Sequence, residues 1–450
     1  MSAISRTVAL ATGCAVVALS AAETAQASGF AIKEQSTTYQ GTSFAGATAG
    51  ALDATTIFFN PAGMTELPGR QMVSNGAYIM PSSEFSGSAN FAARLGGGAV
   101  SGDGTPGDAA NDAFVPSFYG SWEAIADTLW VGIGVTAPWG LVTDYPSDWT
   151  GRYQALYSSL TTYNFQPSLA WKVTPKLSLG AGMQIQYAES ELSQAVDFAS
   201  IIDASAGAAL LYSPGSLDGV GTTKGGGWAV GYTLGALYKF DDSTRIGASF
   251  RSAVDHTLTG EATTSGVPSV STLVALFAAT GATADLTTPV IASAGLYHQI
   301  NRQWAVMADV SWTEWSSFKT LTVEYDNALR SDTVTDEHWK DSVFAALGVS
   351  YKPADAWTLR AGIAYDQSPV PDAWRTARIP DTDRYWLSIG VAYDVSQMVS
   401  IGAAYTHIFA EDATVSLTDD LTGTDAFRSS LSGLYSSSVD IVSMQVKVIF

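Results

Sequence analysis

Residues able to perform chemistry are few and scattered in this chain of 450 residues. The four histidines, His256, His298, His338 and His407, show no spacing typical of a metal site. The one cysteine, Cys14, lies in an apolar stretch at the N-terminus. A lipase would need serine, histidine and an acid brought together, and the sequence has no recognisable nucleophile motif. We therefore expect no enzyme activity, no metal and no cofactor.

Arginines offer a different chemistry, because a carboxylate ligand needs a cation. Arg245, Arg251 and Arg360 fall on the polar phase of segments in which polar and apolar residues alternate. Such arginines often pair with acidic residues, but Arg251 and Arg360 are candidates for binding a ligand carboxylate. Arg152 is expected to be structural. Whether any of them reaches a ligand depends on the elements that carry them.

The composition restricts those elements. Only 14% of the residues are charged and 46% are hydrophobic, against about 25% charged in an average soluble protein. Acidic residues outnumber basic ones 42 to 22, which argues against a nucleic-acid partner. The one apolar stretch approaching the roughly 20 residues of a spanning helix is residues 8–22. A helical membrane protein is therefore excluded.

A two-residue period dominates the remaining sequence. Trp304, Val306, Ala308, Val310 and Trp312, for example, alternate with small or polar residues, and an aromatic stands at each end of the apolar face. This pattern is typical of outer-membrane barrel strands with aromatic girdles. We predict 14 strands, at residues 70–80, 114–123, 129–137, 161–173, 177–194, 227–240, 244–262, 284–299, 303–325, 340–352, 356–366, 384–395, 399–413 and 437–450.

Connections between these strands alternate between short and long, as between periplasmic turns and extracellular loops. An even strand number with closure would pair every backbone group within the membrane. The chain ends on Phe450 after an alternating run, an ending that resembles the assembly signal of bacterial outer-membrane proteins. The predicted fold is all-β, a 14-stranded antiparallel transmembrane β-barrel formed by residues 69–450.

Residues 1–27 are expected to be a cleaved export signal. Arg6 precedes an apolar run, and Ala25-Gln26-Ala27 forms a cleavage site that would leave Ser28 as the mature N-terminus. Lipidation of Cys14 is the alternative. If the signal is cleaved, the mature chain contains no thiol and no disulfide.

Residues 28–68 precede the first predicted strand and lack sustained alternation. They hold large apolar residues, including Phe30, Tyr39, Phe44 and Phe58, which disfavour a solvated tail. A plug inside the barrel and a disordered periplasmic tail both remain open on physical grounds alone.

Several stretches nevertheless resemble the FadL family of outer-membrane transporters of long-chain fatty acids and other hydrophobic compounds. The similar stretches are residues 29–36, 44–47, 53–64, 148–153, 164–170 and 383–388, the third containing Asn60-Pro61-Ala62. The resemblance implies that residues 28–68 are an N-terminal hatch inside the lumen. It also implies that the substrate leaves sideways, through a wall opening made by a kinked strand.

The resemblance assigns roles to residues of the hatch. Phe30 resembles a hatch residue whose position affects the internal pocket. Asn60, Pro61 and Ala62 would lie where the hatch meets the wall, with Asn60 able to bond exposed backbone near the kink.

Two long loops contain apolar clusters that are candidates for substrate capture, because exposed apolar patches usually have a function. The candidates are Ile201, Leu210 and Leu211 in one loop and Leu273, Leu276 and Phe277 in the other. The alternative is that they form a pair of short helices packed on each other.

The predicted function is energy-independent uptake of fatty acids or hydrocarbons across the bacterial outer membrane; the alternative is a general diffusion porin. Expected partners are the hydrophobic substrate and the surrounding outer-membrane lipid and lipopolysaccharide, with the protein a monomer. The acidic loop residues 366–383 and 412–425 suggest the further hypothesis of divalent-cation binding.

Overall fold

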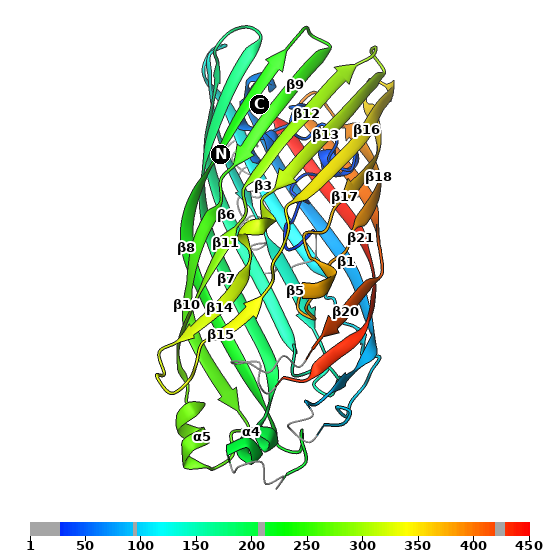
Figure 1. The fold of residues 1–450 in the computed structure, drawn as a ribbon. Coiled ribbons are helices and arrows are strands. Elements are labelled where there is room, and N and C mark those ends of the chain that lie inside the picture. The colour runs from blue at the N-terminus through cyan, green and yellow to red at the C-terminus, as the bar shows by residue number, and fades with distance from the viewer. Residues whose placement is uncertain (1–27, 93–96, 206–211, 419–427) are drawn as a thin grey trace, which may run out of the picture.

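Residues 28–92, 97–205, 212–418 and 428–450 are described by the computed structural model, and they form a closed antiparallel barrel (Figure 1). Closure is made by β1 (Gln71–Asn90) and β21 (Ser430–Ile449), which pair from Gln71 opposite Ile449 to Asn90 opposite Ser430. The predicted barrel is confirmed.

The wall consists of 14 strands, of which eight are continuous and six are interrupted. The continuous strands are β1, β3 (Ala113–Ile125), β6 (Tyr157–Lys172), β7 (Leu177–Asp197), β8 (Asp218–Lys239), β17 (Trp357–Asp366), β18 (Arg384–Asp394) and β21. The interrupted strands are β4 (Leu129–Thr136) with β5 (Gly140–Asp144), β9 (Thr244–Arg251) with β10 (Val254–Ser265), β11 (Thr280–Thr288) with β12 (Ile291–Gln299), β13 (Trp304–Thr313) with β14 (Thr320–Tyr325), β15 (Thr333–Asp336) with β16 (Ser342–Ala354), and β19 (Val399–Ala410) with β20 (Ala413–Leu417). A short strand, β2 (Gly107–Asp108), pairs with the outer part of β1.

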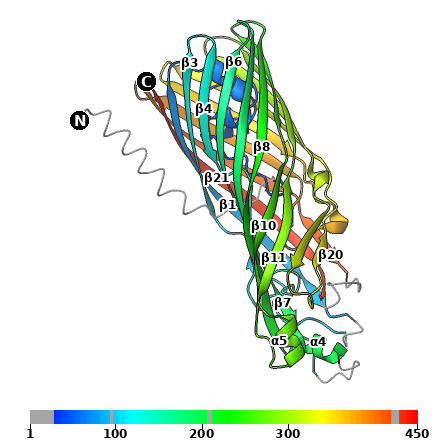
Figure 2. The same cartoon turned by 90° about the vertical axis from the view of Figure 1, so that its left-hand side faces the viewer.

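The two ends of the barrel differ, as Figures 1 and 2 show. One end carries short turns, such as those between β6 and β7 and between β18 and β19. The other end carries the long connections with α4 (Phe198–Ser205) and α5 (Ser271–Leu276). Short turns are periplasmic and long loops extracellular in such barrels. No helix of the described ranges is long and apolar enough to cross a membrane.

Several strands extend farther toward the extracellular end than the sequence predicts. The first was expected at residues 70–80 and runs to Asn90, and the last begins at Ser430 instead of residue 437. The apolar alternation stops at the membrane boundary because lipid no longer contacts the outer face there. Backbone pairing has no such limit and continues into the extracellular part.

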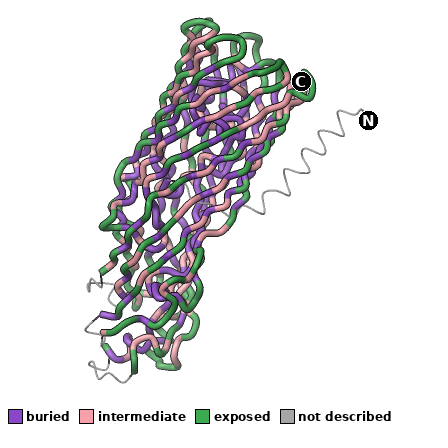
Figure 3. Tube along the Cα trace, turned by 90° about the vertical axis from the view of Figure 1, so that its right-hand side faces the viewer, coloured by how far each residue is buried: buried purple, intermediate pink, exposed green. Residues whose placement is uncertain are grey.

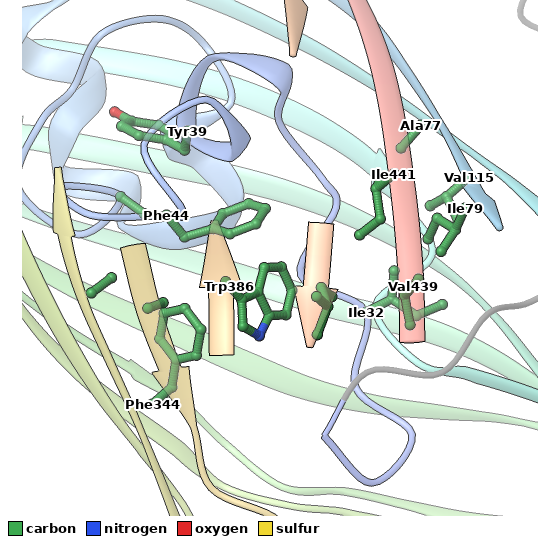
Figure 4. Close-up of a cluster of buried hydrophobic side chains, with 14 of the residues drawn as sticks. Ile32, Tyr39, Phe44, Ala77, Ile79, Val115, Phe344, Trp386, Val439 and Ile441 are labelled. Atoms are coloured by element: carbon green, nitrogen blue, oxygen red, sulfur yellow. The ribbon is translucent and has the colours of Figure 1, made fainter. Parts of the chain in front are cut away.

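Residues 28–68 lie inside the barrel. They form α2 (Thr37–Gln40), α3 (Thr56–Phe59) and the 3-10 helix η1 (Pro61–Glu66), and most are buried (Figure 3). Figure 4 shows side chains of this N-terminal segment against side chains of the wall. The ring centroids of Phe44 and Trp386, for example, lie 6.0 Å apart.

Glycines on the inner wall make room for this segment. A Cβ atom added to Gly180 of β7 would lie 2.3 Å from the backbone nitrogen of Ala62. At Gly247 of β9 and Gly362 of β17 it would lie 2.1 Å from backbone atoms of the segment. Contacts this short do not occur between real atoms, so the small residues of the polar phase are a docking surface and not the lining of an open pore.

Candidate transport pathway

A break in the barrel wall lies at residues 137–139, between β4 and β5. The pairing of β3 with β4 begins only at Phe118, opposite Val135, although β3 pairs with β1 from Ala113 onward. The first part of β3 therefore has no ladder partner on this side. The break interrupts the third strand of the wall.

Backbone groups at the break are bonded by the N-terminal segment. The N–H of Ile32 donates to the carbonyl of Pro138 over 2.8 Å, and the N–H of Gly140 donates to the carbonyl of Phe30 over 2.8 Å. The side-chain amide of Gln35 donates to the carbonyl of Ala137 over 2.8 Å. These bonds satisfy groups that would otherwise be unpaired inside a membrane protein.

Asn60, which the sequence analysis placed near the kink, lies elsewhere. Its Nδ2 donates to the carbonyl of Ala236 in β8 over 3.0 Å and to that of Thr48 over 2.7 Å. Its Oδ1 accepts from the N–H of Ala62, and Pro61 begins η1. The expectation that Asn60 bonds the kink is therefore wrong; Gln35 makes that contact, and Asn60, Pro61 and Ala62 dock the segment against the wall.

Phe30 lies within a cluster of four other aromatic rings. Its ring centroid is 4.6 Å from that of Trp315, 5.7 Å from Trp339, 5.8 Å from Phe318 and 5.9 Å from Trp139. Three of these are edge-to-face contacts, which are favourable for aromatic pairs. The three tryptophans lie at the interruptions between β4 and β5, between β13 and β14, and between β15 and β16, which sequence alternation does not link to one another.

Above this cluster is a cavity with about 810 Å³ of space, here called the middle pocket. Its walls are mainly apolar and include Leu160, Leu258, Leu286 and Phe318, and Phe30 also lines it. Its charged groups include the buried Glu337 and the half-buried Arg378.

Glu337 lies at the interruption between β15 and β16, and Arg378 lies in the connection between β17 and β18; both are beyond the outer aromatic residues of the wall. Burial raises the pKa of Glu337 to about 8, against a weaker opposing effect of the bond from Trp339. Burial is also the main cause that lowers the pKa of Arg378 to about 9. At neutral pH the pocket therefore holds a protonated carboxyl group beside a cationic guanidinium.

A second cavity, the outer pocket, continues from the middle pocket toward the extracellular end. Arg330 and Arg378 both line it. The guanidinium of Arg330 lies 3.8 Å above the ring of Tyr325, and its buried Nη1 has no hydrogen-bond partner among the described residues. Arg330 also lies 5.9 Å from the ring of Phe277, which places this cavity next to α5.

The segments that carry the two loop clusters meet at one aromatic contact, at the start of α4 and directly after α5. Phe198 of α4 meets Phe277 with ring centroids 5.1 Å apart, and Leu273 is buried. Ile201 and Leu276 are half-buried, whereas Val274 remains exposed. Leu210 and Leu211 lie outside the described residues.

Arg251 and Arg360 do not reach the middle pocket. Arg251 donates to Gln184 over 2.8 Å and to the carbonyl of Phe58 over 3.1 Å, so it holds the N-terminal segment to the wall. Arg360 lies beneath Gly41 of that segment. The structure instead brings Arg330 and Arg378 to the pockets. The sequence analysis did not select Arg330 and Arg378. The one feature that could have pointed to them is that they are cations within long loops that otherwise carry acidic residues.

A third cavity, the lower pocket, has about 880 Å³ of space and lies on the other side of the Phe30 cluster. Trp139 and Trp315 line it together with Lys33, Asp309 and Asp366. It also reaches Pro138, at the break in the wall. The rings around Phe30 therefore separate the middle pocket from the lower one.

Arg152 has the structural role expected of it: it pairs with Asp218 over 3.0 Å and closes part of the extracellular end.

Within the described ranges, no group of three or more histidine, cysteine, aspartate or glutamate side chains is arranged to hold a metal ion. The cation hypothesis for the acidic loops thus gains no support from these residues.

A closed barrel, a filled lumen and a series of internal pockets define a transmembrane transport protein of the outer-membrane type. The model of the family described as outer membrane protein transport protein (OMPP1/FadL/TodX) matches residues 18–450. The chain belongs to this family of outer-membrane transporters.

Individual relatives agree with this assignment. An outer membrane protein of Neisseria meningitidis is 31% identical over 94% of this chain and 95% of its own length. The long-chain fatty acid transport protein of Escherichia coli K12 is 28% identical, covering 85% of this chain and 88% of its own. The crystal structure of a Pseudomonas aeruginosa FadL homologue superposes with a TM-score of 0.85 at 26% identity, over 94% of this chain and all of that one.

Proposed function

We propose that this protein takes up long-chain carboxylates of the fatty-acid type, without an energy source and without catalysing a reaction. The observation that carries this proposal is the junction of the middle and outer pockets. There the apolar middle pocket meets Arg378, Arg330 lines the adjoining outer pocket, and the buried Nη1 of Arg330 has no partner among the residues that the structure describes. A carboxylate at this junction would satisfy the guanidinium while its chain fills the apolar part.

The proposed path begins near α4 and α5, where Val274 and Tyr212 are exposed. The ligand moves through the outer pocket to the middle pocket, above Phe30. Displacement of Phe30 would join the middle and lower pockets and open the way to the break at residues 137–139. Exit between β3 and β5 would release the ligand into the membrane.

In this proposal residues 1–27 are the removed signal, residues 28–68 the hatch and residues 69–450 the barrel. The hatch role is supported by the glycine contacts and by the bonds from Gln35 and Asn60 to the wall. Burial of apolar surface is worth about 0.8 kcal/mol per methylene, which is enough to draw a long chain inward. The barrel closes on itself, which supports a monomer surrounded by outer-membrane lipid and lipopolysaccharide.

A general porin is not favoured, because the N-terminal segment fills the lumen that polar solutes would cross. A hydrocarbon substrate remains chemically compatible with the middle pocket, but it would leave the buried Nη1 of Arg330 unpaired. The cationic junction therefore favours a ligand with an anionic head group.

Replacing the guanidinium of Arg330 tests whether the ligand carries an anionic head group. We expect Arg330→Gln to weaken oleate binding by roughly 10- to 100-fold, because a hydrogen bond to a charged group contributes about 1.5–3 kcal/mol. Binding of oleyl alcohol, which has the same chain and a neutral head, should change less than about threefold. Arg302→Gln, at an exposed turn on the periplasmic end, is the control. Equal losses for oleate and oleyl alcohol, or unchanged oleate binding, would contradict the proposal.

A further inference from the structure

Two arginines of the outer pocket carry positive charge without an acidic partner. No ion pair within 4.0 Å joins Arg330 or Arg378 to a carboxylate of the residues that the structure describes. Glu337 supplies the one carboxyl group among the described residues that line this pocket. It is protonated at neutral pH, because burial raises its pKa to about 8. The described lining of the outer pocket therefore holds cations without a resident anion.

Arg378 is fixed by neutral groups of the wall. Its Nη1 donates to Oγ of Ser158 over 2.9 Å and to the carbonyl of Ser193 over 3.3 Å. Its Nη2 donates to Oε1 of Gln194 over 2.9 Å. These acceptors orient the guanidinium, but none of them carries a negative charge. The position of the cation is thus set before a ligand arrives, and its charge is not neutralised.

Arg330 is fixed through the turn between β14 and β15. Its N–H donates to the carbonyl of Asn327 over 2.9 Å, and Nδ2 of Asn327 donates to two backbone carbonyls of α5 over 2.9 and 3.1 Å. The guanidinium lies on the ring of Tyr325, whose hydroxyl is 3.0 Å from Oγ1 of Thr333. These contacts hold the turn and the ring beneath the cation, and they too are neutral.

A third guanidinium and several hydroxyl groups complete the lining. Arg428, which lies two residues before β21, lines the same pocket. The hydroxyl groups are those of Ser193, Thr223, Thr333 and Thr335. The outer pocket has about 630 Å³ of space and shares the apolar residues Leu192, Leu321 and Val323 with the middle pocket. A polar, cationic compartment therefore continues directly into an apolar one.

The number of cations bears on the charge of the head group. A carboxylate carries one negative charge, so it would leave one of the two guanidinium groups of Arg330 and Arg378 without a counter-charge, which is costly where the group is out of water. A phosphate monoester carries a charge of about −1.5 to −2 at pH 7 and has three acceptor oxygens. Guanidinium groups bind phosphate oxygens in bidentate pairs. Such a head group matches both the charge and the donors of the outer pocket.

We propose that the outer pocket binds the head group of a long-chain phosphate monoester, with the chain in the middle pocket, and that it binds this dianion more tightly than a carboxylate with the same chain. Arg330 and Arg378 pair with the phosphate oxygens, and Arg428 adds a third guanidinium. The inference rests on the proposed function, because it uses the same apolar cavity and the same path, and it extends the ligand class from carboxylates to phosphates.

Two ligands that differ by one charge test the proposal in the unaltered protein. Oleyl phosphate and oleyl methyl phosphate have the same chain and the same tetrahedral phosphorus, but the methyl ester carries a single negative charge. At about pH 7.5, above the second pKa of about 6 of a phosphate monoester, we expect oleyl phosphate to bind at least about tenfold more tightly than the methyl ester or oleate. The reason is that a further hydrogen bond between charged groups is worth about tenfold or more. Fluorescence displacement measures each affinity.

Variants locate the preference. Arg330→Gln should reduce the preference for oleyl phosphate over its methyl ester to less than about threefold, because it removes one of the two cations. Arg428→Gln should reduce it as well, while oleate binding changes less. Arg302→Gln, at the periplasmic end, is the matched control and should keep the full preference. Heat-modifiability on gels shows that each variant is folded.

Three results would overturn the inference. The first is equal affinity of the wild type for oleyl phosphate and its methyl ester. The second is tighter binding of octadecylmalonate, a dicarboxylate dianion, than of oleyl phosphate. The third is equal affinity for propyl phosphate and oleyl phosphate, which would make free phosphate the ligand. The proposed function fails by a different result, the missing distinction between oleate and oleyl alcohol, so the two failures can be told apart.

Discussion

Replacing three inner-wall glycines by alanine should loosen the N-terminal segment while leaving the barrel intact. Gly180, Gly247 and Gly362 each face a backbone atom of the segment, and their added Cβ atoms would lie 2.1–2.3 Å from it. A normal contact needs more than 3.4 Å, so the segment must move by about 1 Å at each site.

Overpacking of this kind costs about 1–3 kcal/mol per site. The three glycines lie on β7, β9 and β17, strands that are not neighbours in the wall. Their effects should therefore add, to about 3–9 kcal/mol of docking free energy. Alanine has a higher strand propensity than glycine, so the strands themselves should not be weakened.

Liposome swelling with sugars measures the result. We expect the triple variant to pass sugars faster than the wild type, with faster hydrogen exchange in residues 28–68 and unchanged heat-modifiability on gels. The control is Gly120→Ala with Gly402→Ala, where an added Cβ would meet its nearest atoms at 3.4 and 3.6 Å. If the triple variant folds and stays as tight and as protected as the wild type, or if the control leaks equally, the reasoning is refuted.

Three further changes test the pathway. Phe30→Ala should join the middle and lower pockets and speed oleate release, measured by fluorescence displacement, whereas Phe91→Ala, which removes a ring packed on Tyr153, should not. Oleate affinity should fall as pH rises through about 8, because Glu337 loses its proton there and then repels the ligand carboxylate; Glu337→Gln should abolish this step in a titration from pH 6.5 to 8.5, which stays below the pKa of about 9 of Arg378. Deletion of residues 28–40 should abolish or derange uptake of labelled oleate while the barrel still assembles, and normal uptake would count against the hatch.

Much of the wall was predictable because lipid and lumen impose opposite requirements on alternate residues. Trp304 and Trp312 marked the two ends of an outward face in the sequence, and both are exposed on the outside of the barrel. Interruptions were not predictable in the same way. The predicted strand at residues 129–137 ended before Pro138, but the sequence did not show that the strand resumes as β5 after a break, because the backbone groups at the break bond a segment about 100 residues earlier in the chain.

The pockets were the least predictable part. The alternation in their strands predicted that Arg251 and Arg360 face the inside of the barrel, and both do. The N-terminal segment, however, fills the part of the lumen that these two side chains face. Arg330 and Arg378 lie in connections between strands. These connections have no sequence periodicity from which the direction of a side chain could be predicted. Only the folding of those connections over the end of the barrel brings the guanidinium groups of Arg330 and Arg378 to the outer pocket.

By itself, the sequence determined a charge-poor, alternating chain that must close into a barrel, with an extra apolar segment at its N-terminus. Those properties follow from local rules, since a strand's two faces can be read two residues at a time. Tertiary structure alone decided where the segment docks, which glycines receive it, which side chains bond the wall break and which cations reach the pockets. Each of these is a contact between residues distant in the chain, so its energy depends on the closed barrel and not on neighbouring sequence.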